Sequence, residues 1–103
     1  MDTSSLEKMI TDGKDSAMLR LTLARLMTQS DQWDKAQEHL KTAVELDPSY
    51  TAAWKEWGKV LLNLENKEAA KTAWEKGSEV ARSNGDKQAE KEMAVFLRRL
   101  SKA

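Results

Sequence analysis

Apolar residues recur along this chain at the three- and four-residue spacing of a helical face, and no run of alternating β-branched residues competes with that period. Pro48 is expected to end the third helix and Gly85 the fifth, while Asp15 or Ser16 can cap the second and Asp86 the sixth. The predicted helices cover about residues 4–13, 17–29, 33–46, 49–64, 68–83 and 86–101. The sequence therefore predicts one all-α domain over residues 1–103, an antiparallel stack of helical hairpins with about six helices.

The predicted helices contain an internal repeat of 34 residues. A shift by that length places Leu23 on Trp57, Ala24 on Gly58, Met27 on Leu61, Ala36 on Ala70, Leu40 on Trp74 and Ala43 on Gly77. In each pair a small residue matches a small one, or a large apolar residue matches a large apolar one. A helix–turn–helix unit of this length and pattern resembles the tetratricopeptide repeat family, an α-solenoid. The resemblance implies repeats at 17–50 and 51–84, with capping helices at 4–13 and 86–101.

The segment WKEWGKVL, which starts at Trp54, carries the clearest part of the resemblance. The positions that the resemblance assigns to the structural core are Leu23, Ala24, Met27, Ala36, Leu40, Ala43, Pro48, Trp54, Trp57, Gly58, Leu61, Ala70, Trp74 and Gly77. Two positions depart from the family pattern, because Arg20 replaces a tryptophan and Arg82 a proline. We expect all four tryptophans to fill the core, and the alternative is that Trp33 or Trp54 stacks on a ligand.

In this family the first helix of each hairpin lines a concave groove in which ligand peptides lie. The same shift assigns five candidate peptide-binding residues to that groove: Met18, Leu21, Arg25, Lys55 and Lys59. We expect the first two to form an apolar patch beside a basic triangle of the other three. Such a triangle can hold an acidic peptide or a C-terminal carboxylate by charge-assisted hydrogen bonds. The alternative is that these charges are solvated, with Glu56 close enough to neutralise one of them.

The overall charge argues against several classes of partner. Lys plus Arg total 17 and Asp plus Glu total 17, so the net charge is zero. Non-specific binding to nucleic acid or to a membrane surface requires a basic excess, so both are disfavoured. No apolar run is long enough to span a bilayer. The first residues lack the basic and apolar regions of a secretory signal, so we expect a cytoplasmic location.

Nothing in the sequence predicts an enzyme, a cofactor or a metal site. The chain has no cysteine, and its single histidine, His39, is expected to face solvent. No phosphate-binding or nucleophile motif is present. The leading hypothesis is a protein-interaction module that binds a peptide or a partner helix, possibly an acidic one. The alternative is a self-associating scaffold, a weak homo-oligomer held by apolar residues of its end helices, namely Leu6, Met9, Ile10, Phe96 and Leu97.

Overall fold

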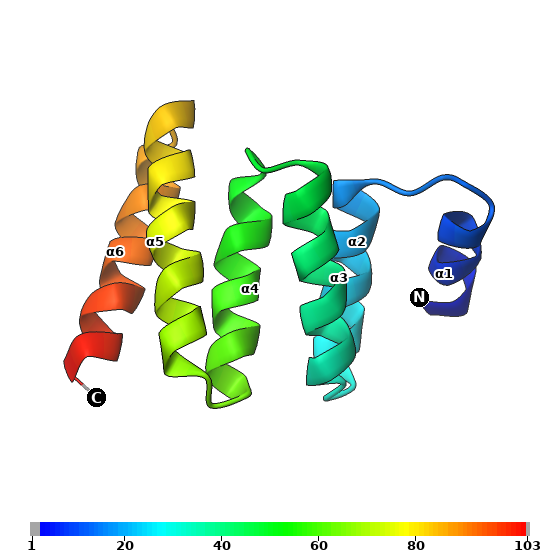
Figure 1. The fold of residues 1–103 in the computed structure, drawn as a ribbon, viewed down its shortest axis with the longest axis horizontal. Coiled ribbons are helices and arrows are strands. Elements are labelled where there is room, and N and C mark those ends of the chain that lie inside the picture. Colours follow the sequence, from blue (N-terminus) through cyan, green and yellow to red (C-terminus); the bar gives the residue numbers. More distant parts are fainter. Residues whose placement is uncertain (1–2, 103) are drawn as a thin grey trace.

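The computed structural model describes residues 3–102, and Figure 1 shows this part of the chain as a row of upright helices. The helices are α1 (Thr3–Thr11), α2 (Ala17–Gln29), α3 (Trp33–Leu46), α4 (Thr51–Asn63), α5 (Lys67–Asn84) and α6 (Lys87–Lys102). No strand is present among these residues. The predicted all-α stack of antiparallel hairpins is therefore confirmed. No helix in residues 3–102 is long and apolar enough to cross a membrane.

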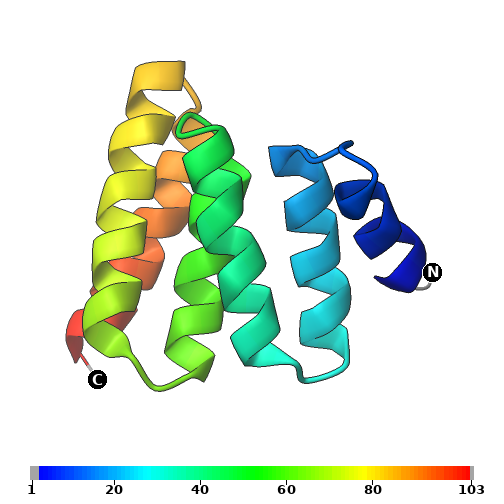
Figure 2. The same ribbon diagram turned by 45° about the vertical axis from the view of Figure 1, so that its right-hand side comes forward.

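Helix α4 is the centre of the stack. It contacts α2, α3, α5 and α6, whereas α3 and α5 do not contact each other. In Figure 1, α2 and α6 lie behind α3 and α5, and Figure 2 shows the same helices turned by 45°. The molecule therefore presents one face made by α2, α4 and α6, and another on which α3 and α5 flank α4. Helix α1 contacts only α2.

Local signals set the helix ends. The Ser16 side chain accepts a hydrogen bond from the backbone N–H of Leu19 at 3.1 Å, so Ser16 rather than Asp15 caps α2. Asp86 accepts from the N–H of Ala89 at 3.0 Å at the start of α6. Gly85 ends α5 in the left-handed conformation, with φ of 73°, as expected of a glycine at this position. The other boundaries lie within two residues of the prediction.

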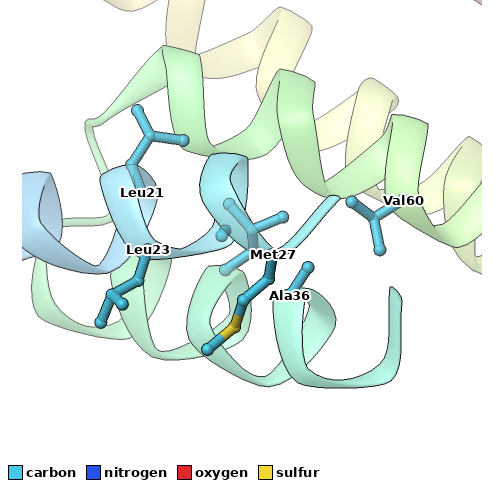
Figure 3. Packing of buried hydrophobic residues seen from close by; sticks show 7 residues of the cluster. Leu21, Leu23, Met27, Ala36 and Val60 are labelled. Atoms are coloured by element: carbon cyan, nitrogen blue, oxygen red, sulfur yellow. The ribbon is translucent and has the colours of Figure 1, made fainter. Parts of the chain in front are cut away.

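Most positions assigned to the core are buried. Figure 3 shows Leu23, Met27 and Ala36 in the cluster between α2, α3 and α4. The buried members of the predicted set are Leu23, Ala24, Met27, Ala36, Leu40, Ala43, Gly58, Leu61, Ala70, Trp74 and Gly77. Trp54 and Trp57 are half-buried. The assignment of Pro48 to the core was wrong, because this residue is exposed. It lies in the turn between α3 and α4, where its ring ends a helix and does not fill the core.

Two glycines allow α4, α5 and α6 to approach closely. A Cβ on Gly58 would overlap the indole of Trp74, whose Nε1 donates a hydrogen bond to the carbonyl of Lys55 at 3.1 Å. A Cβ on Gly77 would lie 2.6 Å from the sulfur of Met93 and 2.9 Å from the Cβ of Trp54. These two glycines of the repeat therefore have a packing reason, since each makes room for a large side chain of a neighbouring helix.

Candidate functional site

The predicted apolar patch does not form. Leu21 is only 2% exposed and belongs to the same core cluster as Leu23 and Val60 (Figure 3). The expectation that it faces a groove was wrong because both α1 and α4 pack on α2 and the core closes over it. Met18 is 69% exposed, but it borders a separate hollow together with Leu46 at the C-terminal end of α3.

The three predicted cations do lie on the α2–α4–α6 face, and each has a carboxylate partner. The Nζ atom of Lys55 lies 3.5 Å from an oxygen of Glu92 on α6. One carboxylate oxygen of Glu56 lies 3.9 Å from both the guanidinium of Arg25 and the Nζ atom of Lys59. Glu56 therefore serves two cations, where the sequence suggested that it neutralises one.

The three cations differ in how available they are. The side chain of Lys55 is largely covered, whereas those of Arg25 and Lys59 are 53% and 47% exposed. Lys59 also lies 5.5 Å from the ring centre of Phe96, within reach of a cation–π interaction. Arg25 and Lys59 together form a half-exposed pair of positive charges with one shared negative charge. Pairs at this distance and exposure contribute little to stability, so they can exchange partners readily.

Sequence reasoning missed a hollow of about 610 Å³ between α3 and α5. We call it the tryptophan hollow, because Trp54, Trp57 and Leu61 of α4 form its floor. The centroids of the two indoles lie 5.8 Å apart, with the ring planes inclined by 35°. The Trp54 Nε1 donates a hydrogen bond to the carbonyl of Pro48 at 2.9 Å, which fixes that ring. The Trp57 Nε1 is buried and has no hydrogen-bond partner within the described structure.

The walls of the tryptophan hollow come from the flanking helices. Gln37 lines it from α3, and Ala69, Thr72, Ala73 and Lys76 line it from α5. The signal that could have revealed it is the run of small side chains on one face of α5, since small residues opposite half-buried tryptophans leave space. If the two tryptophans were fully buried, larger side chains would have to cover them at these positions of α5.

A polar cluster at the start of α2 was also missed. Arg20 binds both carboxylate oxygens of Asp15, at 2.8 Å each, and its Nη1 donates to the Nδ1 atom of His39 at 3.0 Å. His39 is therefore half-buried between α2 and α3 and does not face solvent as expected. Burial, and then the charge of Arg20, lower the pKa of His39, although the nearby carboxylates of Glu7, Asp15 and Glu38 oppose this. The hydrogen bond from Arg20 lowers the pKa of Asp15 below its ordinary value of 3.8.

This cluster predicts a loss of stability in mild acid. The folded pKa of His39 lies below that of the unfolded chain, about 6.5, so the unfolded chain binds more protons between the two values. The contribution of neutral His39 to the free energy of unfolding is therefore fully present above about pH 6.5, and it declines as the pH falls below that value. The free energy of unfolding in urea should fall between about pH 7.5 and pH 5.5 in the wild type, and fall less in His39→Gln. Equal declines in both proteins would assign the effect to other groups. Asp15 titrates below this window.

The described residues contain no group of three His, Cys, Asp or Glu side chains placed to hold a metal ion. The α2–α4–α6 face thus offers cations, and the opposite face offers amides and aromatic surface, which are groups that bind other molecules.

Comparison with known proteins gives matches along the chain. A sequence model of the tetratricopeptide repeat matches residues 17–60. The TPR repeat-containing protein PA0015 of Pseudomonas aeruginosa is 45% identical, over 100% of this chain and 98% of its own length. The solution structure of protein BPP2914 from Bordetella parapertussis has 42% identity and a TM-score of 0.84, covering 99% of this chain and 89% of that one. A tetratricopeptide repeat domain protein from Salinibacter ruber shares the fold at 24% identity, with a TM-score of 0.79 and coverage of 84% and 87%.

Proposed function

This chain belongs to the tetratricopeptide repeat family, whose repeats generally mediate protein–protein interaction, and on that premise we propose that it is a non-catalytic module that binds a peptide or partner helix on its α2–α4–α6 face. In the family this is the face of the concave ligand groove. The proposal keeps Arg25 and Lys59 from the predicted site, because they remain half exposed. It leaves out Leu21, which is buried, Lys55, which is tied to α6, and Met18, which borders another hollow.

One observation carries this proposal: two cations from neighbouring helices share a single carboxylate. A ligand carboxylate that enters between Arg25 and Lys59 would gain two charge-assisted hydrogen bonds and relieve the competition for Glu56. Leu62 lies one turn beyond Lys59 on α4 and is exposed, so it can supply the apolar contact expected of Leu21. The favoured ligand is therefore an acidic peptide with an apolar residue close to its carboxylate.

A double charge reversal tests this assignment. In Arg25→Glu/Lys59→Glu, the group formed by Arg25, Glu56 and Lys59 would change from two cations and one carboxylate to three carboxylates. Partners captured by the wild-type chain from lysate of the source cells should be recovered about tenfold less by the variant, by quantitative mass spectrometry. Circular dichroism must show an unchanged helical content.

The matched control is Lys35→Glu/Lys71→Glu, which makes the same charge change on α3 and α5. Both lysines are exposed, and neither makes an ion pair within the described residues. The control should capture partners as the wild type does. Equal losses in both double variants would mean that overall charge, and not the α2–α4–α6 face, governs capture.

The alternative, a self-associating scaffold, has fewer exposed apolar residues for contacts between copies than the sequence suggested. Leu6 and Ile10 of α1 are packed against one core cluster, and Phe96 and Leu97 of α6 against another. Of the five apolar residues proposed for such contacts, Met9 alone is exposed. No observation within residues 3–102 therefore favours the scaffold over the interaction module.

A further inference from the structure

The tryptophan hollow lies on the face opposite to the proposed ligand face, and its floor is open because of the helix arrangement. Helices α3 and α5 both pack on α4 without contacting each other, and the half-buried Trp54 and Trp57 of α4 line the hollow between them. Its volume, about 610 Å³, is within the usual range of ligand-binding clefts. Tryptophan is one of the residue types enriched among the energetic anchors of protein interfaces. We propose that the tryptophan hollow is a second docking surface, which accepts a short amphipathic helix of a partner protein that carries an acidic residue for Lys76.

The floor of the hollow is held in place before any partner arrives. The Trp54 indole donates to the carbonyl of Pro48, and its Cβ packs on Gly77 of α5, where no side chain could fit. Trp57 lies against Trp54 at ring-contact distance. A docking helix therefore meets an aromatic surface whose rotamers need not be ordered on binding, and this reduces the entropic cost of association.

The walls favour a helix over an extended peptide. An extended backbone needs hydrogen-bond partners along its whole length, whereas a helix satisfies its own N–H and C=O groups. The Thr72 hydroxyl already donates to the carbonyl of Glu68, and the side-chain Oδ1 of Asn66 accepts from the N–H of Ala69. The Gln37 amide and the Asn66 Nδ2 group remain for a ligand backbone, which is fewer than an extended chain needs along its length. Its α5 wall runs from Asn66 to Lys76, about 15 Å at the rise of a helix, which matches two to three helical turns.

Charge identifies the polar residue that the partner helix must carry. Lys76 is the only ionisable side chain that lines the tryptophan hollow, and it makes no ion pair within residues 3–102. A purely apolar helix would cover this cation without compensating it, which is unfavourable. A glutamate or aspartate at the end of the helix nearest Lys76 restores the balance. The next hollow along α5 is lined by Lys76 and Glu79 together, so a second acidic residue further along would be opposed by Glu79.

The experiment uses a defined probe and the whole chain. The probe is an acetylated, amidated alanine-based helix of about 16 residues, with leucines spaced to share one face and a glutamate one turn beyond them. It is titrated into the ¹⁵N-labelled protein while the tryptophan indole N–H signals are followed by NMR. The signals of Trp54 and Trp57 should shift in a saturable way, and a companion peptide with alanines in place of the leucines should leave them unmoved.

Two variants test the site. Thr72→Arg places a long side chain at an exposed position of the wall, and Lys76→Glu reverses the one charge. Each should weaken binding of the glutamate probe by about tenfold or more. Lys76→Glu should in turn bind a companion peptide that carries lysine in place of glutamate. Lys71→Glu is the matched control on the α6 side of the same helix, and it should bind as the wild type does.

Three outcomes would overturn the proposal. The first is no shift of the indole signals up to about 1 mM probe, the weakest affinity expected of a working site. The second is an equal affinity in the wild type and Thr72→Arg. The third is a concentration-dependent dimer, seen by light scattering without probe and abolished in Thr72→Arg, which would make a second copy the occupant. Arg25→Glu/Lys59→Glu must still bind the probe, so failure here and failure of the α2–α4–α6 proposal are distinguishable.

Discussion

Replacing Gly58 with alanine should destabilise the protein by roughly 2–4 kcal/mol, although alanine is the better helix former. The added methyl group would overlap the indole of Trp74. That ring cannot move aside freely, because its Nε1 donates to the carbonyl of Lys55 and it lies against the ring of Phe96, with centroids 5.1 Å apart and planes inclined by 40°. Overpacking against a fixed ring and loss of the hydrogen bond outweigh the gain in helix propensity, about 1 kcal/mol. Urea unfolding monitored by circular dichroism measures the difference.

A suppressor variant checks the stated cause of this loss. Trp74→Leu removes the indole that the new methyl group would strike, at the cost of a cavity and of one hydrogen bond. The double variant Gly58→Ala/Trp74→Leu should therefore be more stable than the sum of the two single losses predicts, by about 1 kcal/mol or more. If the two losses simply add, the destabilisation by Gly58→Ala does not come from a clash with Trp74. A single variant within about 0.5 kcal/mol of the wild type would contradict the close approach itself.

Met93→Ala should lower the free energy of unfolding by about 2–4 kcal/mol, and the loss should affect the whole stack of helices. Met93 is fully buried, and its sulfur occupies the space that Gly77 leaves open between α5 and α6. Because the same cluster includes Leu61 of α4 and Trp74 of α5, a cavity here weakens the centre of the molecule as well as its last helix. Urea unfolding followed by tryptophan fluorescence should show one cooperative transition with a lowered midpoint.

The chain supplies its own control for this change. Met18→Ala makes the same substitution at a methionine that is mostly exposed, so the free energy of unfolding should stay within about 0.5 kcal/mol of the wild type. Hydrogen exchange then shows how far the Met93→Ala effect reaches. Loss of protection confined to α6, with α2 to α5 unchanged, would mean that the last helix is a dispensable cap.

Features that depend on nearby residues were predictable from the sequence. The helix ends at Ser16, Gly85 and Asp86 follow from interactions that span three or four residues. The buried positions of the repeat follow from a spacing that recurs, since the same environment selects small or large residues twice. The all-α hairpin stack rests on these two kinds of signal.

The errors concern contacts that form only when distant helices meet. Leu21 is buried because α1 and α4 both pack on its helix, which no property of its immediate neighbours reveals. Lys55 is not available to a ligand because its side chain pairs with Glu92, which lies 37 positions away in the sequence. The half-buried state of Trp54 and Trp57 requires knowing that α3 and α5 leave a gap, a matter of helix placement that the spacing of apolar residues does not encode.

The order of contacts along the chain has a consequence for folding speed. Each helix touches only its immediate neighbours and the helix after next, so no contact between helices joins the two ends of the chain. The chain therefore closes only short loops as it folds, and proteins with such local contacts fold in microseconds to milliseconds. Since α4 shares surfaces with four helices, we expect the transition state to form around it, with α1 joining last.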